Sequence, residues 1–381
     1  MPTPLKIAIA AGETSGDLLA AHLIPQLQQK FPNCVIAGVS GEHMVSQGCE
    51  QIIDCQELAV MGLAEILTSL PRLYRCRQQF ITFLHEFKPD IYIGIDAPDF
   101  NLTIAKYIKS QGVFTVQYNS PKVWAWRRYR VKKIQRSIDL MLTQFPFEAK
   151  FYEPYQVKAK YCGHPFADVI QPVIKEIKQQ RPIIGLAVGS RQGELLRHSK
   201  LFLLTALKIK QELPGSEFVL PLINEKQKRH FLKSYEKYAP SLKISIIIGR
   251  FREAIAGVDC VLTAAGTATL EIMLLGKPMV VTYQLSKLTY WIAKLLVNVE
   301  HVALPNLLAQ QRIVPELIQM QATPETLSRE ILNWLQHPEK IAELQQKYQA
   351  LRQPLTDKAL IKAANYIAEE YANRKGSQND G

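Results

Sequence analysis

The sequence lacks the features that mark membrane-spanning, secreted and zinc-stabilised proteins. No uncharged apolar run approaches the length of a membrane span, and the first residues do not have the layout of a signal peptide. The six cysteines are scattered, with no CxxC pair and no histidine cluster at metal-ligand spacing. We therefore expect a cytoplasmic protein whose cysteines are buried thiols in a reducing environment.

Acidic residues are few relative to basic ones, with 34 Asp and Glu against 46 Lys and Arg and a formal net charge of +12. Such an excess favours an anionic partner, which is a nucleic acid, an anionic membrane surface or a phosphorylated ligand. Charge alone does not choose among these partners or exclude an enzyme that is merely basic. With 381 residues, 47% of them apolar, the chain is large enough for two globular domains.

Apolar, β-type runs alternate with amphipathic segments along most of the chain. This alternation predicts βαβ units and parallel sheets, and therefore an α/β fold with two Rossmann-like domains. The expected strands are Lys6–Ala11, Val35–Ser40, Ile91–Ile95 and Phe114–Tyr118 in the first half, and Ile183–Val188, Glu217–Pro221, Ile244–Ile248, Cys260–Ala264 and Pro278–Tyr283 in the second.

The junction between the two halves is expected near Asp168–Arg181, where a proline and a stretch rich in lysine and glutamine break the apolar pattern. The last hundred residues have a helical pattern, with a heptad-like region at Pro324–Arg352. The polar tail Asn373–Gly381 is predicted to be disordered. We accordingly expect an N-terminal domain, a C-terminal domain and a terminal helical segment over residues 1–168, 169–355 and 356–381.

Two carboxylates follow the expected strand Ile91–Ile95. They would lie at the carboxyl edge of a parallel sheet, where open α/β folds bind their ligands. Asp96 there can act as a general base that accepts a proton from a sugar hydroxyl. Asp99 is a second candidate for the base. Together with Asn101 it also suits the cap of the following helix.

The segment Ala11–Asp17 lies between the first strand and a helix expected to begin near Leu18. Its small residues permit a tight turn, and a helix N-terminus offers N–H groups to an anion. It is not a GxGxxG fingerprint, so a dinucleotide site is unsupported. Ser15 or Asp17 can cap the helix, which leaves Glu13 without a capping role and suggests that it faces a cleft.

Two further segments are amphiphilic. Lys122–Arg136 interleaves Trp124 and Trp126 with basic residues, Arg127 among them, which suits nucleic-acid bases, lipid phosphates, membrane headgroups or a solvated helix face with one buried tryptophan. Met61–Arg77 has apolar residues at helical spacing bordered by arginines, which is typical of a core-facing helix and also of an interfacial membrane helix. The apolar residues of that second segment are Ile66, Leu67, Leu70, Leu73 and Tyr74.

The second half carries three weak signals that point to one kind of ligand. Ser190 and Arg191 follow a strand, where the arginine can bind phosphate. Gly266 and Thr267 follow another strand and offer amides and a hydroxyl to a diphosphate, and Glu271 one turn later can bind a ribose diol. Asn306 offers an amide at a further turn. Together these residues indicate a nucleoside-diphosphate site.

The motifs resemble those of a known family, the lipid-A-disaccharide synthases, which are inverting glycosyltransferases with two Rossmann-like domains (the GT-B fold). The matching segments occur in the same order from end to end. They are AGETSGD (11–17), ELAVMGLAEIL (57–67), GIDAPDFNL (94–102), SPKVWAWR (120–127), GHPFAD (163–168), GSRQGE (189–194), AGTATLE (265–271) and LPNLLA (304–309).

The resemblance implies transfer of 2,3-diacylglucosamine from UDP-2,3-diacylglucosamine to 2,3-diacylglucosamine 1-phosphate, giving a β-1,6-linked disaccharide 1-phosphate and UDP. It implies that Asp96 is the base for the acceptor 6-hydroxyl, that Glu13 faces the cleft and that Arg191 lies near the UDP phosphates. Glu271 and Asn306 match donor-site positions. No DxD-type motif occurs where a divalent ion would be expected, so we expect no metal or other cofactor.

The resemblance also implies partners. Members of the family bind the inner membrane from the cytoplasmic side through the region matching Ile66–Tyr74, and their dimers exchange C-terminal segments. We therefore expect peripheral association with an anionic inner-membrane surface, a homodimer exchanged at the C-terminus and no nucleic-acid partner.

Four residues depart from the family pattern. Val188 replaces a proline, Asn119 an apolar residue, Gln284 a basic residue and Gln310 a glycine. The last two leave donor-side details and acyl-chain preference open. The alternatives are another GT-B transferase acting on a lipid acceptor, a nucleic-acid-binding protein and a sugar-nucleotide epimerase of the same fold. The transferase that completes the peptidoglycan lipid precursor has a glycine-rich first loop, which Gly12–Gly16 does not reproduce.

Overall fold

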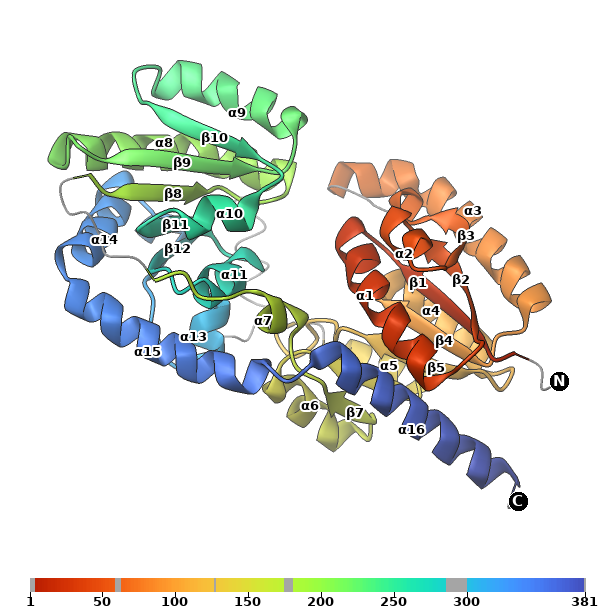
Figure 1. Cartoon of the computed structure of the whole chain (residues 1–381). Helices are drawn as coiled ribbons and strands as arrows, with labels where there is room; N and C mark the ends of the chain where they lie inside the picture. Colours follow the sequence, from red (N-terminus) through yellow and green to blue (C-terminus); the bar gives the residue numbers. More distant parts are fainter. Residues whose placement is uncertain (1–3, 59–62, 127, 175–180, 286–299, 380–381) are drawn as a thin grey trace. The chain divides into compact units, whose positions relative to one another are not determined.

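The computed structural model describes residues 4–58, 63–126, 128–174, 181–285 and 300–379. The chain forms two compact units (Figure 1), of which the first contains Met1–Asp168 and Pro354–Gly381 and the second Val169–Gln353. Each unit is a parallel β-sheet with helices, which confirms the α/β fold with two Rossmann-like domains and a helical C-terminal segment.

The first unit contains a seven-stranded sheet in the order β3-β2-β1-β4-β5-β6-β7, and every strand pair in it is parallel. Its strands are β1 (Lys6–Ala11), β2 (Val35–Ser40), β3 (Glu50–Asp54), β4 (Ile91–Ile95), β5 (Phe114–Tyr118), β6 (Leu140–Thr143) and β7 (Ala159–Tyr161). The four strands predicted in this half have the predicted bounds. Strands β3, β6 and β7, which lie at or next to the two edges of the sheet, were not predicted.

The helices of the first unit follow these strands along the chain, and α16 lies at the C-terminal end. They are α1 (Thr14–Lys30), α2 (Glu42–Ser46), α3 (Leu63–Phe87), α4 (Pro98–Lys109), α5 (Val131–Ser137), α6 (Pro146–Tyr152), α7 (Pro165–Val169) and α16 (Ala359–Asn379), with short 3-10 turns η1 (Cys55–Leu58), η2 (Arg128–Arg130) and η3 (Glu153–Tyr155). The prediction that the first helix begins near Leu18 was wrong, because α1 begins four residues earlier, at Thr14.

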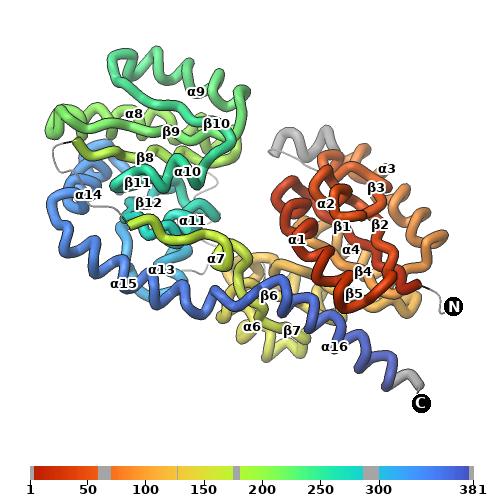
Figure 2. Tube along the Cα trace, in the orientation of Figure 1, coloured from red at the N-terminus to blue at the C-terminus, as the bar shows by residue number. Residues whose placement is uncertain are grey.

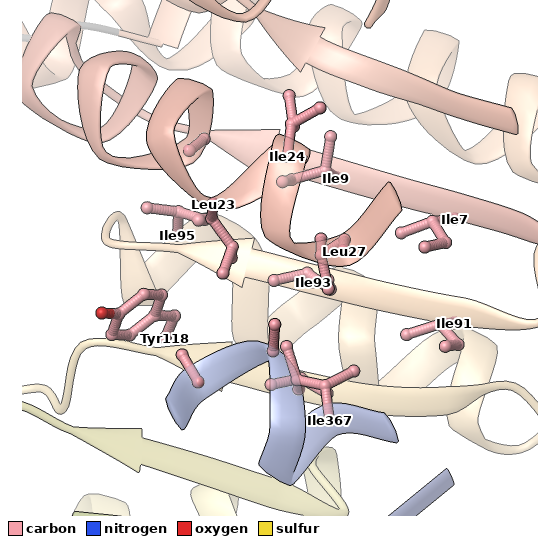
Figure 3. Packing of buried hydrophobic residues seen from close by; sticks show 14 of the residues in the cluster. Ile7, Ile9, Leu23, Ile24, Leu27, Ile91, Ile93, Ile95, Tyr118 and Ile367 are labelled. Atoms are coloured by element: carbon pink, nitrogen blue, oxygen red, sulfur yellow. The ribbon is translucent and has the colours of Figure 1, made fainter. Parts of the chain in front are cut away.

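Two apolar clusters cover the two faces of this sheet. Because successive strand residues point to opposite faces, Ile7 and Ile9 pack against α1 and α16, whereas Ala8 and Ala10 belong to the cluster of α3, α4 and α5. Figure 3 shows the first cluster, in which residues of α1 and of strands β1 and β4 lie near Ile367 of α16. The sheet is therefore covered on both faces, as parallel sheets require.

Helix α16 belongs to the first unit although it ends the chain (Figure 2). Ala363, Ala364 and Ile367 are fully buried in its contact with the sheet and α1. Farther along, Arg374 Nη1 donates to Asp139 Oδ2 at 2.7 Å and to the Val113 carbonyl, and Arg374 Nη2 donates to the Gly112 carbonyl. The predicted disorder is therefore wrong for residues 373–379, which are helical, and the ion pair of Arg374 attaches this helix to the first unit.

The second unit contains a six-stranded sheet in the order β10-β9-β8-β11-β12-β13. Its strands are β8 (Ile183–Ala187), β9 (Glu217–Leu222), β10 (Ile244–Ile248), β11 (Cys260–Ala264), β12 (Met279–Tyr283) and β13 (Glu316–Ile318). Its helices are α8 (Gln192–Glu212), α9 (Glu225–Tyr238), α10 (Phe251–Ala256), α11 (Ala268–Leu274), α13 (Leu304–Ala309), α14 (Pro324–Gln336) and α15 (Pro338–Leu355), with the 3-10 turn η4 (Gln319–Gln321).

The predicted strands of this half are present with shifts of at most one residue, and β13 was missed. The predicted heptad-like region is interrupted, since α14 ends at Gln336 and α15 begins at Pro338. Proline has no N–H to donate and restricts the residue before it, so His337 ends the first helix. Within the residues that the structure describes, every helix is too short or too polar to span a bilayer.

We expect Ile367→Ala to lower the free energy of unfolding of the first unit by about 2–5 kcal/mol, because it leaves a cavity in a closed core. The matched control is Ile361→Ala on the same helix, where the side chain is 41% exposed and the loss should be about 0.5 kcal/mol or less. Urea unfolding followed by circular dichroism measures both. Equal losses would contradict the packing of α16 against the first unit.

Candidate active site

The turn that follows β4 has a strained backbone. Asp96 and Ala97 have φ angles of 50° and 35°, both in the left-handed region, which costs about 1–3 kcal/mol for each such residue. Buried amides hold the turn. Asn101 Nδ2 donates to the carbonyl oxygen of Asp96 at 2.9 Å, and Gln117 Nε2 donates to the same oxygen at 3.1 Å. These hydrogen bonds fix the backbone that presents the Asp96 carboxyl.

Two glycines make room for this turn. A Cβ added at Gly12 would lie 2.1 Å from the Cβ of Ala97, and one added at Gly94 would lie 2.7 Å from the Cβ of Asn101. No side chain can approach so closely. The loop after β1 therefore packs directly on the strained turn after β4, its neighbour in the sheet.

The Asp96 carboxyl is only partly accessible, and its packed surroundings raise its pKa above the ordinary value. The nearby negative charge of Glu13 raises this pKa further, whereas a hydrogen bond from Asn119 and the charge of Lys122 lower it. Asn119 Nδ2 lies 2.5 Å from Asp96 Oδ1. A carboxylate that is reachable and more basic than usual is suited to accept a proton.

The structure brings only two of the three predicted catalytic carboxylates together. Glu13 is exposed and electrostatically coupled to Asp96. Asp99 points elsewhere, because its side chain is 79% exposed and forms an ion pair with Arg130. The prediction that Asp99 caps the next helix was also wrong, since Ala97 occupies the N-cap position of α4.

Asp17 has a different capping role from the one the sequence suggested. Its buried carboxylate accepts hydrogen bonds from the backbone N–H groups of Gly41, His43 and Met44, the first at 2.7 Å. It therefore caps α2 rather than α1, whose N-cap residue is Glu13.

The tryptophan-containing loop after β5 is tied to α6. Trp124 Nε1 donates to Glu148 Oε1 at 3.1 Å, and the hydroxyls of Ser120 and Tyr152 lie 2.9 Å apart. Glu148 is buried and also accepts from two backbone N–H groups at the start of α6. Trp126 is exposed, and Arg127 lies outside the described residues. The loop thus has one anchored tryptophan and one that faces solvent.

Helix α3 has a core face and an exposed face. Leu73 packs against the core of the first unit, whereas Leu70 and Tyr74 are 52% and 55% exposed. The guanidinium of Arg77 lies 5.1 Å from the centre of the Tyr74 ring. The side chains of Ile66 and Leu67 lie outside the described residues. Both interpretations of this segment, a core helix and a membrane contact, therefore remain predictions.

In the second unit, Ser190 and Arg191 are exposed in the loop between β8 and α8. The loop is held from both sides, since Glu194 Oε2 accepts from the N–H of Arg191 at 3.3 Å and Gln227 Nε2 donates to the Ser190 carbonyl. A Cβ on Gly189 would lie 2.7 Å from Glu194, so the loop requires glycine there. The arginine side chain is thus displayed at the carboxyl edge of the sheet.

His198, which was not predicted to have a role, joins the ends of two strands. Its Nε2 accepts from the N–H of Gln284 at 3.1 Å, so its Nδ1 donates to the carbonyl of Val188, also at 3.1 Å. Burial lowers the pKa of this histidine, which agrees with the neutral ring that these two bonds require. A lone histidine within an apolar helical pattern gives no signal of such a role.

Gly266 and Thr267 lie after β11, which is paired with β8, so their loop and the Arg191 loop share one edge of the sheet. A Cβ on Gly266 would meet open space, and Thr267 is exposed. Glu271 is engaged by Arg252, whose Nε lies 2.6 Å from Glu271 Oε2. The predicted ribose contact of Glu271 therefore has to compete with this ion pair.

The Asn306 side chain is fully buried and uses all its hydrogen-bonding groups within the protein. Its Nδ2 donates to Val314 O and Glu316 Oε1, and its Oδ1 accepts from the N–H groups of Ile313 and Val314. In this structure Asn306 holds the loop between α13 and β13. Its predicted donor-site role stays a prediction.

Gln310, one of the departures from the family pattern, ends α13 with a φ of 51°. This left-handed conformation at a helix C-terminus is the one that glycine adopts most easily. Glutamine therefore adopts here a conformation that glycine would adopt with less strain. Among the described residues, no group of three or more His, Cys, Asp or Glu side chains is placed to hold a metal ion.

Comparison with known proteins identifies the family. A family model described as lipid-A-disaccharide synthetase matches residues 7–371. The chain belongs to this family. The lipid-A-disaccharide synthase of Glaesserella parasuis serovar 5 is 43% identical over 95% of this chain and 97% of the relative. That of Actinobacillus pleuropneumoniae serotype 7 is 41% identical, covering 98% of each.

Solved structures support the fold at low sequence identity. A UDP-GlcNAc 2-epimerase from Neisseria meningitidis bound to UDP-GlcNAc has a TM-score of 0.62 at 13% identity, covering 98% of this chain and 100% of that one. The calicheamicin glycosyltransferase CalG4 has a TM-score of 0.58 at 13% identity, covering 98% and 99%. The fold is thus that of GT-B glycosyltransferases, and family membership identifies the chain as a glycosyltransferase.

We expect Gly12→Ala to reduce activity at least tenfold and to destabilise the first unit by about 1–3 kcal/mol, because the new methyl group overlaps the Cβ of Ala97. Adding Ala97→Gly removes that Cβ and permits the left-handed backbone, so the double variant should recover both properties. Steady-state kinetics and thermal unfolding measure the effects. A double variant as impaired as the single one would show that the contact is not the cause.

Burial raises the pKa of Glu148 from 4.5 to about 7. Between these two pH values the Glu148 carboxyl is therefore protonated in the folded protein and ionised in the unfolded chain. The stability that comes from this protonated form is present below pH 4.5 and is lost as the pH rises through 7. We expect the stability of wild type relative to Glu148→Gln to fall by about 3 kcal/mol between pH 4 and pH 8.

Urea unfolding of both proteins across this pH range measures the difference, and Glu153→Gln, at an exposed glutamate nearby, is the control. A difference between wild type and Glu148→Gln that is independent of pH would contradict the raised pKa.

Proposed function

We propose that the enzyme transfers 2,3-diacylglucosamine from UDP-2,3-diacylglucosamine to 2,3-diacylglucosamine 1-phosphate in lipid A biosynthesis. The products are the β-1,6-linked lipid A disaccharide 1-phosphate and UDP. Membership of the lipid-A-disaccharide synthase family supports the reaction class. The observation that carries the mechanism is the basic, partly accessible Asp96 carboxyl on its rigid turn.

The acceptor half of the reaction needs a base at the 6-hydroxyl. In our proposal Asp96 accepts the hydroxyl proton while the oxygen attacks the anomeric carbon of the donor, and the bond from that carbon to UDP breaks. One displacement of this kind inverts the anomeric configuration. The raised pKa of Asp96 makes the carboxylate a better proton acceptor.

The donor half needs positive charge where the leaving diphosphate develops its own negative charge. Arg191 and Ser190 are exposed at the carboxyl edge of the second sheet, and the loop with Gly266 and Thr267 follows the adjacent strand. We propose that Arg191 binds the diphosphate, assisted by the amides of the second loop. In this proposal Asn306 acts indirectly, by holding its loop. Glu271 binds the ribose after its ion pair with Arg252 breaks.

The exposed face of α3 and the packing of α16 support two proposed contacts of the enzyme. The exposed Leu70 and Tyr74 with the neighbouring Arg77 support peripheral binding to an anionic inner-membrane surface from the cytoplasm. Helix α16 packs closely on the first unit. In a C-terminally exchanged homodimer, α16 of a second copy occupies that same surface. The proposal includes no nucleic-acid partner.

We expect Asp96→Asn to lower turnover by 10² to 10⁴-fold, because the amide cannot take the proton, while affinity for UDP stays near that of wild type. Asp99→Asn, which alters an exposed ion pair, should retain activity. The assay is UDP release from UDP-2,3-diacylglucosamine with and without the acceptor. Isothermal titration with UDP gives the affinity.

Acceptor-dependent release of UDP with a disaccharide product is the expected result for wild type. UDP release without acceptor, or conversion of UDP-N-acetylglucosamine, would instead favour the epimerase alternative suggested by the fold. An active Asp96→Asn variant would transfer the role of base to another residue.

A further inference from the structure

Asn119 contacts the proposed base from the end of the neighbouring strand. It follows β5, which pairs with β4 in parallel register, and its Nδ2 lies 2.5 Å from Asp96 Oδ1. Its backbone is held on one side by a hydrogen bond from its N–H to Leu142 O at 3.1 Å. Its φ of 77° lies in the left-handed region, which asparagine tolerates better than most residues. The amide is therefore held rigidly against the carboxyl.

We propose that Asn119 is a positioning residue for the transfer reaction, because its amide holds Oδ1 of Asp96 and leaves Oδ2 to receive the acceptor proton. This inference rests on the proposed role of Asp96 as the base. The side chain of Asn119 donates a hydrogen bond to this carboxyl. Oδ2 lies beside Gly16, where a Cβ would come within 3.7 Å of it.

The remaining groups around Asp96 act on it through their charge. Glu13, from the loop after β1, raises the pKa of Asp96, and the charge of Lys122, from the loop after β5, lowers it. Lys122 is exposed, so solvent screens its charge. The phenol of Tyr118 on β5 is also close enough to interact electrostatically with Asp96, and burial keeps it neutral by raising its own pKa. Asn119 is thus the fixed group that favours the ionised carboxylate.

The orientation and the ionisation of Asp96 are consequently linked through one hydrogen bond. Removing the amide frees the carboxyl to rotate and takes away a donor that favours its charged form. The base should then be protonated at higher pH, and it should also be less well directed once ionised. A residue that only filled space at this position would alter neither the pH dependence nor the orientation.

The test is the pH dependence of kcat/KM for UDP release in three variants. Asn119→Gly removes the amide and keeps the left-handed backbone accessible, and Asn119→Leu keeps the approximate size without a donor. We expect both to move the acid limb of the profile upward by about one pH unit and to lower the plateau. Asn119→Asp should move the limb farther, because two adjacent carboxyls resist ionising together.

The matched control is Asn33→Gly, an exposed asparagine with a φ of 62° that is distant in sequence from the site. It makes the same backbone change and should leave the profile unaltered. Thermal unfolding identifies any variant that does not fold, and Asn119→Gly carries the test if Asn119→Leu fails to fold.

An acid limb that stays at the wild-type pH in folded Asn119→Gly, or a loss that is uniform at every pH, would overturn the inference. The outcome is distinguishable from failure of the proposed function. Full activity of Asp96→Asn refutes the base itself, whereas an inactive Asp96→Asn combined with an unshifted Asn119→Gly refutes only the role of Asn119.

Discussion

The organisation of the first unit's site depends on the left-handed turn that follows β4. Asp96 and Ala97 adopt this conformation without being glycine, so their strain must be offset by contacts elsewhere. Asn101 and Gln117 supply these contacts with buried amides, and Gly12 leaves the space that the turn occupies. The position of the Asp96 carboxyl therefore depends on residues in or near β1, β4 and β5, which are neighbours in the sheet.

Both units use the same physical arrangement to gather polar groups. In a parallel sheet all carboxyl ends meet at one edge, so loops distant in sequence become neighbours there. In the first unit this edge unites Asp96, Glu13 and Asn119, which follow three adjacent strands. In the second unit it unites the loops of Arg191 and Gly266. The donor and acceptor chemistry proposed for the family is thereby divided between two similar scaffolds.

The sequence predicted the long central strands well because they are apolar on both faces and bounded by clear breaks. It failed for β3, β6, β7 and β13, which lie at or next to sheet edges. Strands β3, β7 and β13 have few buried residues, and β6 is buried but has only four residues, so each gives a weak pattern. It also failed for the end of α16, whose polar residues are ordered by Tyr371 and Arg374 contacting distant segments. Only the folded chain contains those partners.

The sequence alone determined the family, the two α/β domains, and Asp96 and Arg191 as candidates, because motifs and strand periodicity are local properties. Only the tertiary structure decided the roles of their neighbours. It paired Asp99 with Arg130, buried Asn306 within its own loop, made Asp17 the cap of α2, and directed Asn119 at Asp96. Each of these contacts joins side chains to groups beyond their own turn, and the direction of a side chain across a sheet edge is set by packing rather than by local sequence.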